Sequence, residues 1–283
     1  MGASTAVALV LALVSTTLTN IAYLREHDAA AALPVLSMRR PLQSALLLLR
    51  DRSWMLGFGM ETVGFLLYAL ALALASLALV QSIAAGGIGV LAYVSARLAG
   101  RRLGGRELTG VLVSVFGLVL LAVSLVGGSG EGSAGSTGPI LLWLGATAGA
   151  AGVVLLGRRL IGIAVAYGVA GGLFFAMGDV ATKVATEGGA RAGFVLLLIL
   201  GYTAGTAFLQ LGYQAGGALT VAGLATLLTN AVPIAAGTIV LDEPVPAGAF
   251  GVLRVLAFVA VIAGAVLLAR PEAASRANAE QPD

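Results

Sequence analysis

One carboxylate stands out because of what surrounds it. Glu61 is the only charged residue between Arg52 and Arg97, in a stretch that is otherwise apolar. A charge at membrane depth costs at least about 2.5 kcal/mol on insertion scales, so Glu61 is expected to face the protein interior or water. At helical spacing, its face is shared by small and aromatic residues, namely Gly57, Gly64, Phe65 and Tyr68. This face can line a cavity that binds substrate; the alternative is a structural carboxyl bonded to Tyr68 or to a neighbouring helix.

Three charged residues of the second half are candidates for a gate or a structural ion pair. Asp179 and Lys183 are one helical turn apart and can pair at i, i+4. The alternative partner of Asp179 is Arg254, which is expected at a similar depth. By rise per residue, Glu61 and Asp179 differ in depth by roughly 15 Å. This separation argues against one ion that is chelated by both carboxylates.

Uncharged polar residues provide a second candidate cavity lining. Gln210 and Asn230 lie in apolar stretches, and Pro233 is placed to break its helix and free a backbone carbonyl. A broken helix at the bilayer midplane is where many transporters bind substrate. The alternative is that these residues serve packing and interhelical hydrogen bonds, as the glycines of 145–149 and 168–172 are expected to do.

The residue types exclude most enzyme chemistry. Cysteine is absent, and the single histidine, His27, is expected in a charged loop. Thiol nucleophiles and clusters of His or Cys metal ligands are therefore excluded, as is a serine protease with a histidine base inside the membrane. We expect no enzyme, no cofactor and no nucleic-acid partner, since the topology below explains the positive charge.

The composition identifies the bilayer as the solvent. Hydrophobic residues make up 59% of the 283 residues and charged ones 10%, against about 25% charged in soluble domains. One helical crossing takes about 20 residues. The sequence therefore predicts an all-α polytopic membrane helical bundle of about nine transmembrane helices. The expected spans are residues 6–23, 54–75, 77–96, 108–126, 139–156, 161–182, 193–213, 218–241 and 249–269.

Orientation follows from the preference of Arg and Lys for the cytoplasmic side. With the N-terminus outside and the C-terminus inside, thirteen arginines fall at the cytoplasmic face, and only Lys183, Arg191 and Arg254 do not. Segment 33–50 is interrupted by Arg39 and Arg40, so we expect an interfacial helix. A ten-span variant, in which this segment crosses and the N-terminus is inside, stays open.

The chain divides into two membrane halves. The first, 1–126, holds four spans and the interfacial segment; a Gly/Ser-rich external linker, 127–138, leads to the second, 139–270, with five. A disordered cytoplasmic tail, 271–283, is expected after them. At an offset of 141 residues Gly110 falls on Gly251, and hairpin 77–126 overlies hairpin 218–267 in the opposite sense. This is the inverted-repeat arrangement of many secondary transporters; the alternative is that any two apolar hairpins align as well.

One run of residues resembles a known family. It consists of Gly59, Glu61, Phe65, Tyr68, Ala69, Leu79, Val80, Gly86 and Gly87, followed by a basic loop and Gly110. It is similar to the second to fourth helices of NIPA-type magnesium transporters, which belong to the drug/metabolite transporter superfamily. The nine-span layout with a basic loop after the first span is also similar, and covers nearly the whole chain.

The second half extends the resemblance, with departures. Lys183 stands near the end of the sixth helix as the family's lysine does, and 242–244 (Asp-Glu-Pro) resembles the Glu-Pro of EamA-type members. In contrast, Gln81-Ser82 replaces Thr-Pro, Arg101-Arg102 replaces Asn-Glu and Ala222 replaces a proline. The superfamily is therefore better supported than magnesium as the substrate.

The resemblance implies a secondary transporter of magnesium or another divalent cation, with Glu61 as a metal ligand. One alternative is an exporter of small organic metabolites, because intramembrane carboxylates are scarce and Mg²⁺ needs oxygen ligands. The other is a non-transporting membrane scaffold. The expected partners are a small molecule or ion and the lipid bilayer, with a homo-oligomer left open.

Overall fold

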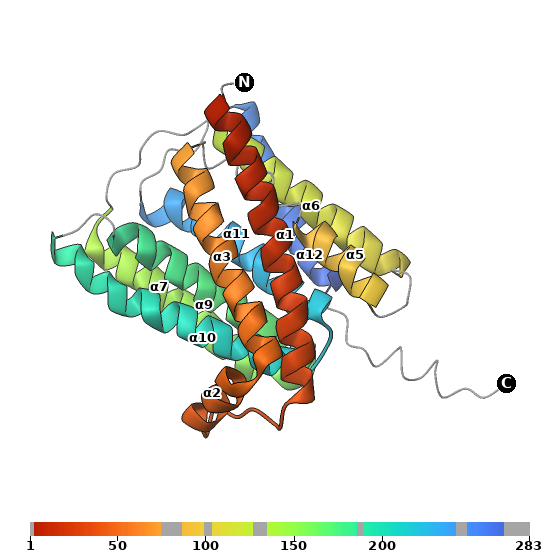
Figure 1. The fold of residues 1–283 in the computed structure, drawn as a ribbon. Helices are drawn as coiled ribbons and strands as arrows, with labels where there is room; N and C mark the ends of the chain where they lie inside the picture. The colour runs from red at the N-terminus through yellow and green to blue at the C-terminus, as the bar shows by residue number, and fades with distance from the viewer. Residues whose placement is uncertain are drawn as a thin grey trace.

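In the computed structural model (Figure 1), all regular structure in the described residues is helical. These residues are 3–74, 87–98, 104–126, 135–185, 189–241 and 248–268. The helices are α1 (Ala3–Ala32), α2 (Pro41–Arg50), α3 (Arg52–Leu74), α5 (Gly87–Leu98), α6 (Gly105–Val126), α7 (Thr137–Leu156), α8 (Arg158–Ile161), α9 (Ile163–Ala185), the 3-10 helix η1 (Gly189–Phe194), α10 (Val195–Tyr213), α11 (Ala218–Val240) and α12 (Ala249–Leu268). Helices suit an apolar solvent because they satisfy their backbone hydrogen bonds internally.

The all-α membrane fold is confirmed. Six helical segments of the described chain are long and apolar enough to cross a bilayer: 6–32, 137–156, 163–181, 189–213, 218–237 and 249–268. Each of the nine predicted spans overlaps a helix, although the part of span 77–96 before Gly87 lies outside the described residues. The chain is therefore a multi-pass helical membrane protein.

Two predicted segments have other bounds in the structure. Segment 33–50 forms a turn and the ten-residue helix α2, about 15 Å long and so half the hydrocarbon thickness. A helical crossing is not formed there, and its interfacial position stays a prediction. The second half begins inside the predicted linker, since α7 starts at Thr137. The rest of the linker before residue 135 and the tail 271–283 lie outside the described residues.

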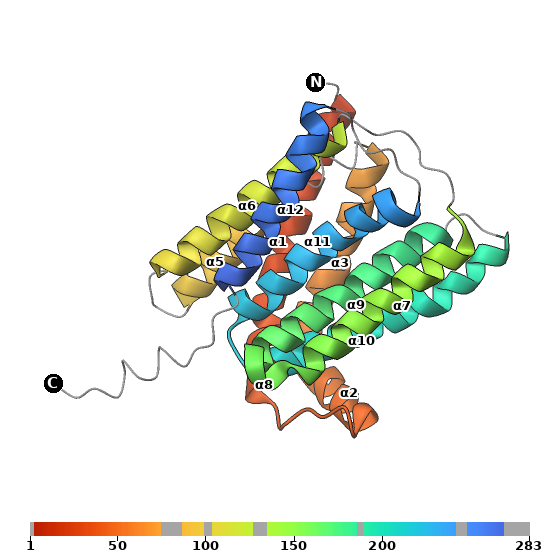
Figure 2. The same cartoon turned by 180° about the vertical axis from the view of Figure 1, so that it is seen from behind.

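Helix α11 is the centre of the bundle. Seen from behind, it lies between the α6–α12 pair and the group formed by α7, α9 and α10 (Figure 2). Its buried face supplies a large share of the main apolar core, with Leu219, Val221, Ala225 and Leu227 each at most 4% exposed. A helix buried on most sides reads as apolar all round, as this sequence does.

Glycines on two faces of α9 set how closely its neighbours approach. A Cβ at Gly168 or Gly172 would meet the α11 backbone at 2.8 Å. Gly171 and Gly178 face α10, where the carbonyl oxygen of Gly205 and the ring of Tyr202 would lie 3.2 and 3.0 Å from a Cβ. The prediction that the glycines of 168–172 serve close packing is confirmed. It is wrong for 145–149, because a Cβ at Gly145 or Gly149 meets nothing within 4 Å.

Helices α6 and α12 pack antiparallel. At one end, Arg106 donates to the carbonyls of Leu267 and Val266 over 3.1 and 3.2 Å. At the other, Arg254 donates to the Ser124 hydroxyl over 3.3 Å. Helix α5 also contacts α11. Hairpins 77–126 and 218–267, which overlie at the 141-residue offset, therefore contact each other through these helices. This contact fits the predicted inverted repeat but does not test it.

Candidate functional site

The first helix is longer than predicted, and this places an acid inside the bundle. The expected span ended at residue 23, but α1 continues to Ala32. His27 is therefore helical, and its predicted loop position is wrong. Arg25 and Asp28 face outward on these last turns, whereas Glu26 is 0% exposed. A carboxyl group without any accessible surface needs partners that compensate for its lost hydration.

Glu26 lies against a second carboxyl group. Gln210 Nε2 on α10 donates to Glu26 Oε2 over 2.6 Å. The Glu61 carboxyl on α3 interacts electrostatically with Glu26 and lies near the Tyr23 hydroxyl. Two ionised carboxylates contain no donor and repel each other. A proton or a cation shared by the two groups would therefore stabilise the pair.

Two glycines of α3 make this approach possible. A Cβ at Gly57 would lie 2.8 Å from Glu26 Cγ, and one at Gly64 would lie 2.5 Å from Thr19 Oγ1. Ser15 Oγ also donates to the Gly64 carbonyl over 2.6 Å. At Gly57 and Gly64, the predicted face of α3 therefore packs on α1, and its role as a cavity lining stays a prediction. Phe65 is 54% exposed and points away from it.

Several buried oxygens beside the pair accept no hydrogen bond within the described part of the chain. They are Glu26 Oε1, Gln210 Oε1 and the Tyr213 hydroxyl. Gln210 and Tyr213 lie three residues apart on α10, and Tyr213 is within electrostatic reach of both acids. An unsatisfied buried oxygen costs about 1–3 kcal/mol. These atoms form an oxygen-rich environment that a cation would stabilise.

Asp179 forms a second polar level. It accepts a hydrogen bond of 2.5 Å from the Tyr202 hydroxyl on α10. It is also within electrostatic reach of the Tyr68 and Tyr23 phenols. Tyr23 also interacts electrostatically with Glu61 and Glu26. The described residues contain no group of three or more His, Cys, Asp and Glu side chains placed to hold one metal ion.

The predicted ion pair of the second half stays a prediction. Asp179 bonds to Tyr202, whereas buried Arg254 donates to the hydroxyl and the carbonyl of Ser124 over 3.3 and 3.5 Å. Tyr202 is on α10 and Ser124 is on α6, so Asp179 and Arg254 bond to different helices. The side chain of Lys183 lies outside the described structure.

The predicted helix break at Pro233 is wrong, since α11 continues through this residue to Val240. Without an N–H, Pro233 still leaves the carbonyl one turn earlier without its usual donor. Asn230 Nδ2 donates to the Thr226 carbonyl over 2.8 Å, the packing role left open for it. Gln210 is the one member of this predicted set that joins the acid pair.

A second glutamine of α10 fastens the end of α1. Gln214 Oε1 accepts from the Leu36 amide over 2.9 Å, and its Nε2 donates to the Ala30 carbonyl over 2.7 Å. Nearby, His27 Nε2 lies 3.2 Å from the Gly216 carbonyl. The acid pair is thus bordered on this side by a turn that is held mainly by side-chain to backbone bonds.

We expect Gln214→Leu to loosen this turn. The substitution removes the acceptor of the Leu36 amide, at a cost of about 1–3 kcal/mol. It also removes one of two donors to the Ala30 carbonyl, which still accepts from the Leu33 amide. Amide exchange at Leu36 should become faster, as hydrogen-deuterium exchange mass spectrometry would show. Gln43→Leu on the exposed face of α2 is the matched control and should leave this rate unchanged. Unchanged exchange at Leu36 in both variants would contradict the assignment.

Comparison with known proteins adds evidence that is independent of this geometry. The chain is similar to a probable magnesium transporter. It is 27% identical to NIPA9 of Arabidopsis thaliana over an alignment that covers 91% of this chain and 80% of the relative. No family model and no solved structure matches the chain. Because the alignment with NIPA9 covers so much of both proteins, the likeness is not confined to one helix or one loop.

Sequence reasoning found Glu61, Gln210 and Tyr68 but missed Glu26 and Tyr23. A signal was present: the run 29–33 (Ala-Ala-Ala-Ala-Leu) has high helix propensity, and Pro34 is the first stop signal after Glu26. Charge alone ended the predicted span too early. The contact of Glu26 with Gln210 joins residues 184 positions apart, which no local pattern reveals.

Proposed function

We propose that this protein is a secondary transporter of magnesium or a closely related divalent cation, and that the cation passes the carboxyl pair of Glu26 and Glu61. The observation that carries the proposal is the proximity of these two carboxyl groups in an apolar bundle, where the contacts of the described residues include the amide of Gln210 but no cationic side chain. A divalent cation neutralises both groups at once. The similarity to NIPA9 supports magnesium as the cation.

The candidate ligands fit a hard cation that must be bound and then released. Mg²⁺ prefers oxygen ligands, binds through one or two carboxylates and keeps several of its waters. Glu26, Glu61, Gln210 and Tyr213 offer only oxygens as ligands. A transported ion must also bind weakly enough to leave. Two carboxylates with amide and phenol oxygens fit that requirement better than a cage of three or more acids.

The proposed path has two levels. Glu26 lies six residues before the end of α1 and Glu61 nine residues after the start of α3, so both lie toward the end of the bundle that carries α2. Asp179 with Tyr202 forms the other level, and Tyr68 is within its reach. With the N-terminus outside, the carboxyl pair belongs to the cytoplasmic half and Asp179 to the outer half. Membership of the drug/metabolite transporter superfamily, with inverted repeats, is part of the proposal.

Flux through the purified protein tests the function. Proteoliposomes that contain a magnesium-sensitive dye should take up Mg²⁺ faster than protein-free vesicles, while Na⁺ and neutral amino acids should not be transported. Transport of amino acids without Mg²⁺ flux would indicate the metabolite exporter instead. Absence of flux for every solute in a folded, inserted protein would indicate a scaffold.

A further inference from the structure

Helix α2 carries two faces of different character. Leu47 and Leu48 pack toward Ala29, Leu36 and Trp54. The opposite face shows apolar side chains at i, i+4 and i+7, with Leu42, Leu46 and Leu49 exposed by 81%, 51% and 54%. The helix is fixed in this orientation because the Ser44 hydroxyl accepts from the Ser37 amide over 2.9 Å and donates to the Ser37 carbonyl over 3.2 Å.

Arginines flank the exposed apolar face. Arg39 and Arg40 precede α2, Arg50 ends it, and all three are exposed. No acidic residue occurs from Ala29 to Arg50. A helix with leucines on one exposed face and cations at its ends matches a membrane surface, where leucines enter the acyl region and arginines meet phosphate groups.

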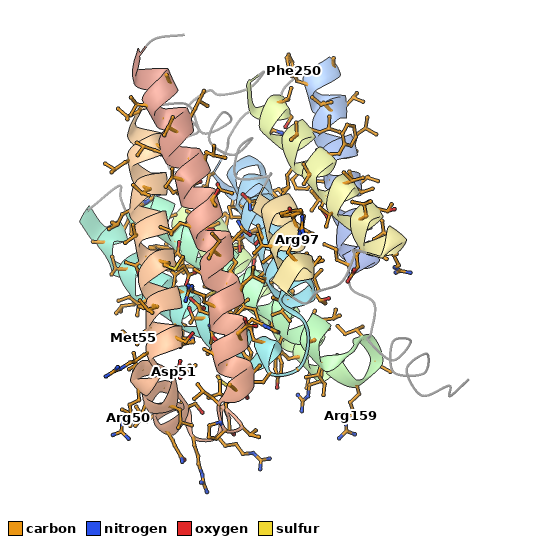
Figure 3. The ribbon with its side chains drawn as sticks, turned by 45° about the vertical axis from the view of Figure 1, so that its right-hand side comes forward. Arg50, Asp51, Met55, Arg97, Arg159 and Phe250 are labelled. Carbon is orange, nitrogen blue, oxygen red and sulfur yellow. The ribbon has the colours of Figure 1, made fainter. Side chains whose placement is uncertain are left out.

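A second group of exposed leucines and arginines lies at the end of the bundle that carries α2. In Figure 3, Arg50 and Arg159 lie at the end of the bundle opposite Phe250. Arg158 and Arg159 of α8 are exposed, as are Leu156 and Leu160, by 85% and 90%. Exposed leucines beside exposed arginines therefore occur on two separate elements at this end. This arrangement is expected where one leaflet meets the protein.

We propose that the exposed face of α2, formed by Leu42, Leu46 and Leu49 with Arg39, Arg40 and Arg50, is a docking surface for anionic phospholipids of the adjacent leaflet. The charge of this surface selects the lipid class, since its three arginines outnumber the one acid that follows α2, Asp51, and favour a net negative headgroup over a zwitterionic one. The inference does not depend on transport, because it concerns a surface and not the acid pair.

Lipid retention tests the charge selectivity. Detergent-solubilised full-length protein is titrated with phosphatidylglycerol or phosphatidylcholine, and bound lipid is counted by native mass spectrometry. The wild type should retain phosphatidylglycerol preferentially. The double variant Arg39→Gln with Arg40→Gln should bind it about 30-fold more weakly, and Arg39→Lys with Arg40→Lys should keep most of the affinity. Equal retention by the Gln variant and the wild type would overturn the proposal, as would equally effective competition by inorganic phosphate.

A position-specific label tests the insertion of the leucines. The chain has no cysteine, so Leu46→Cys introduces a unique attachment point for an environment-sensitive fluorophore. In phosphatidylcholine vesicles with added phosphatidylglycerol, its emission should shift to the blue and be quenched by acyl-chain quenchers. The same label at the exposed Gln43, beside the leucine face, should be quenched less. A water-like emission at position 46, quenched mainly by aqueous iodide, would overturn the docking of this face.

Discussion

Replacing Glu26 by glutamine is expected to reduce magnesium flux on the order of 10- to 100-fold, the loss typical of disturbed metal ligation. The amide keeps the shape of the side chain, and Gln210 can still donate to its oxygen, so insertion and folding should survive. What disappears is one of the two negative charges that the cation neutralises. Glu61→Gln should have an effect of similar size, measured as initial Mg²⁺ uptake into proteoliposomes.

The control for this prediction stands on the same helix. Asp28 is two residues after Glu26, but its side chain is 69% exposed and contacts His27. Asp28→Asn removes the same charge without touching the pair and should transport like the wild type. Flux at wild-type rates in both the Glu26→Gln and Glu61→Gln variants would mean that the pair is a structural, proton-sharing carboxyl group. The proposed path would then have to be abandoned.

Adding one methyl group at Gly172 is expected to destabilise the protein by about 1–3 kcal/mol or to prevent folding. A Cβ there would lie 2.8 Å from both Cα and O of Ala225 and 2.9 Å from Leu228 Cβ. Backbone atoms of a central helix cannot move away as the end of a flexible side chain does. Helix α9 would have to separate from α11, which disrupts the main core.

Gly149→Ala on α7 is the matched control. It also exchanges a helical glycine for alanine, but its Cβ meets nothing within 4 Å. Since alanine has the higher helix propensity, this variant should be as stable as the wild type or slightly more so. The measurement is the thermal midpoint of both variants in the same detergent. Equal midpoints would show that α9 and α11 adjust without cost.

How much the sequence predicts depends on whether the signal is local. The helical membrane fold and Glu61 follow from local signals, because an apolar run of about 20 residues and a lone charge within it are visible along the chain. The site also depends on which helix faces which. Glu26 meets Gln210 and Glu61 only because α1, α3 and α10 converge, and its neighbours Arg25 and Asp28 make it look like a loop residue.

Polar residues in apolar stretches were a weaker guide for the same reason. Asn230 satisfies its side-chain amide one turn away on its own helix, and Pro233 is tolerated within α11. Both fit the sequence pattern of a binding site, but the described contacts give neither a partner across helices. A polar side chain reveals a site only when its partners are known, and Gln210 is the case in which they are.

The close packing of α1 on α3 has a mechanical consequence. Gly57 and Gly64 allow the two helices to pack closely near the acids, and the Ser15 hydroxyl of α1 donates to the Gly64 carbonyl of α3. Glu26 and Glu61 therefore lie on one closely packed helix pair, the α1–α3 body, whereas Gln210, Asp179 and Tyr202 lie on a second pair, the α9–α10 body. If the bodies rock against each other, the two carboxyl groups keep their separation, while the bond from Gln210 lengthens or breaks. A cation held by the pair would move with the α1–α3 body and would separate from its ligands on the α9–α10 body. The strength of cation binding would therefore change during this motion, although the two charged ligands stay the same.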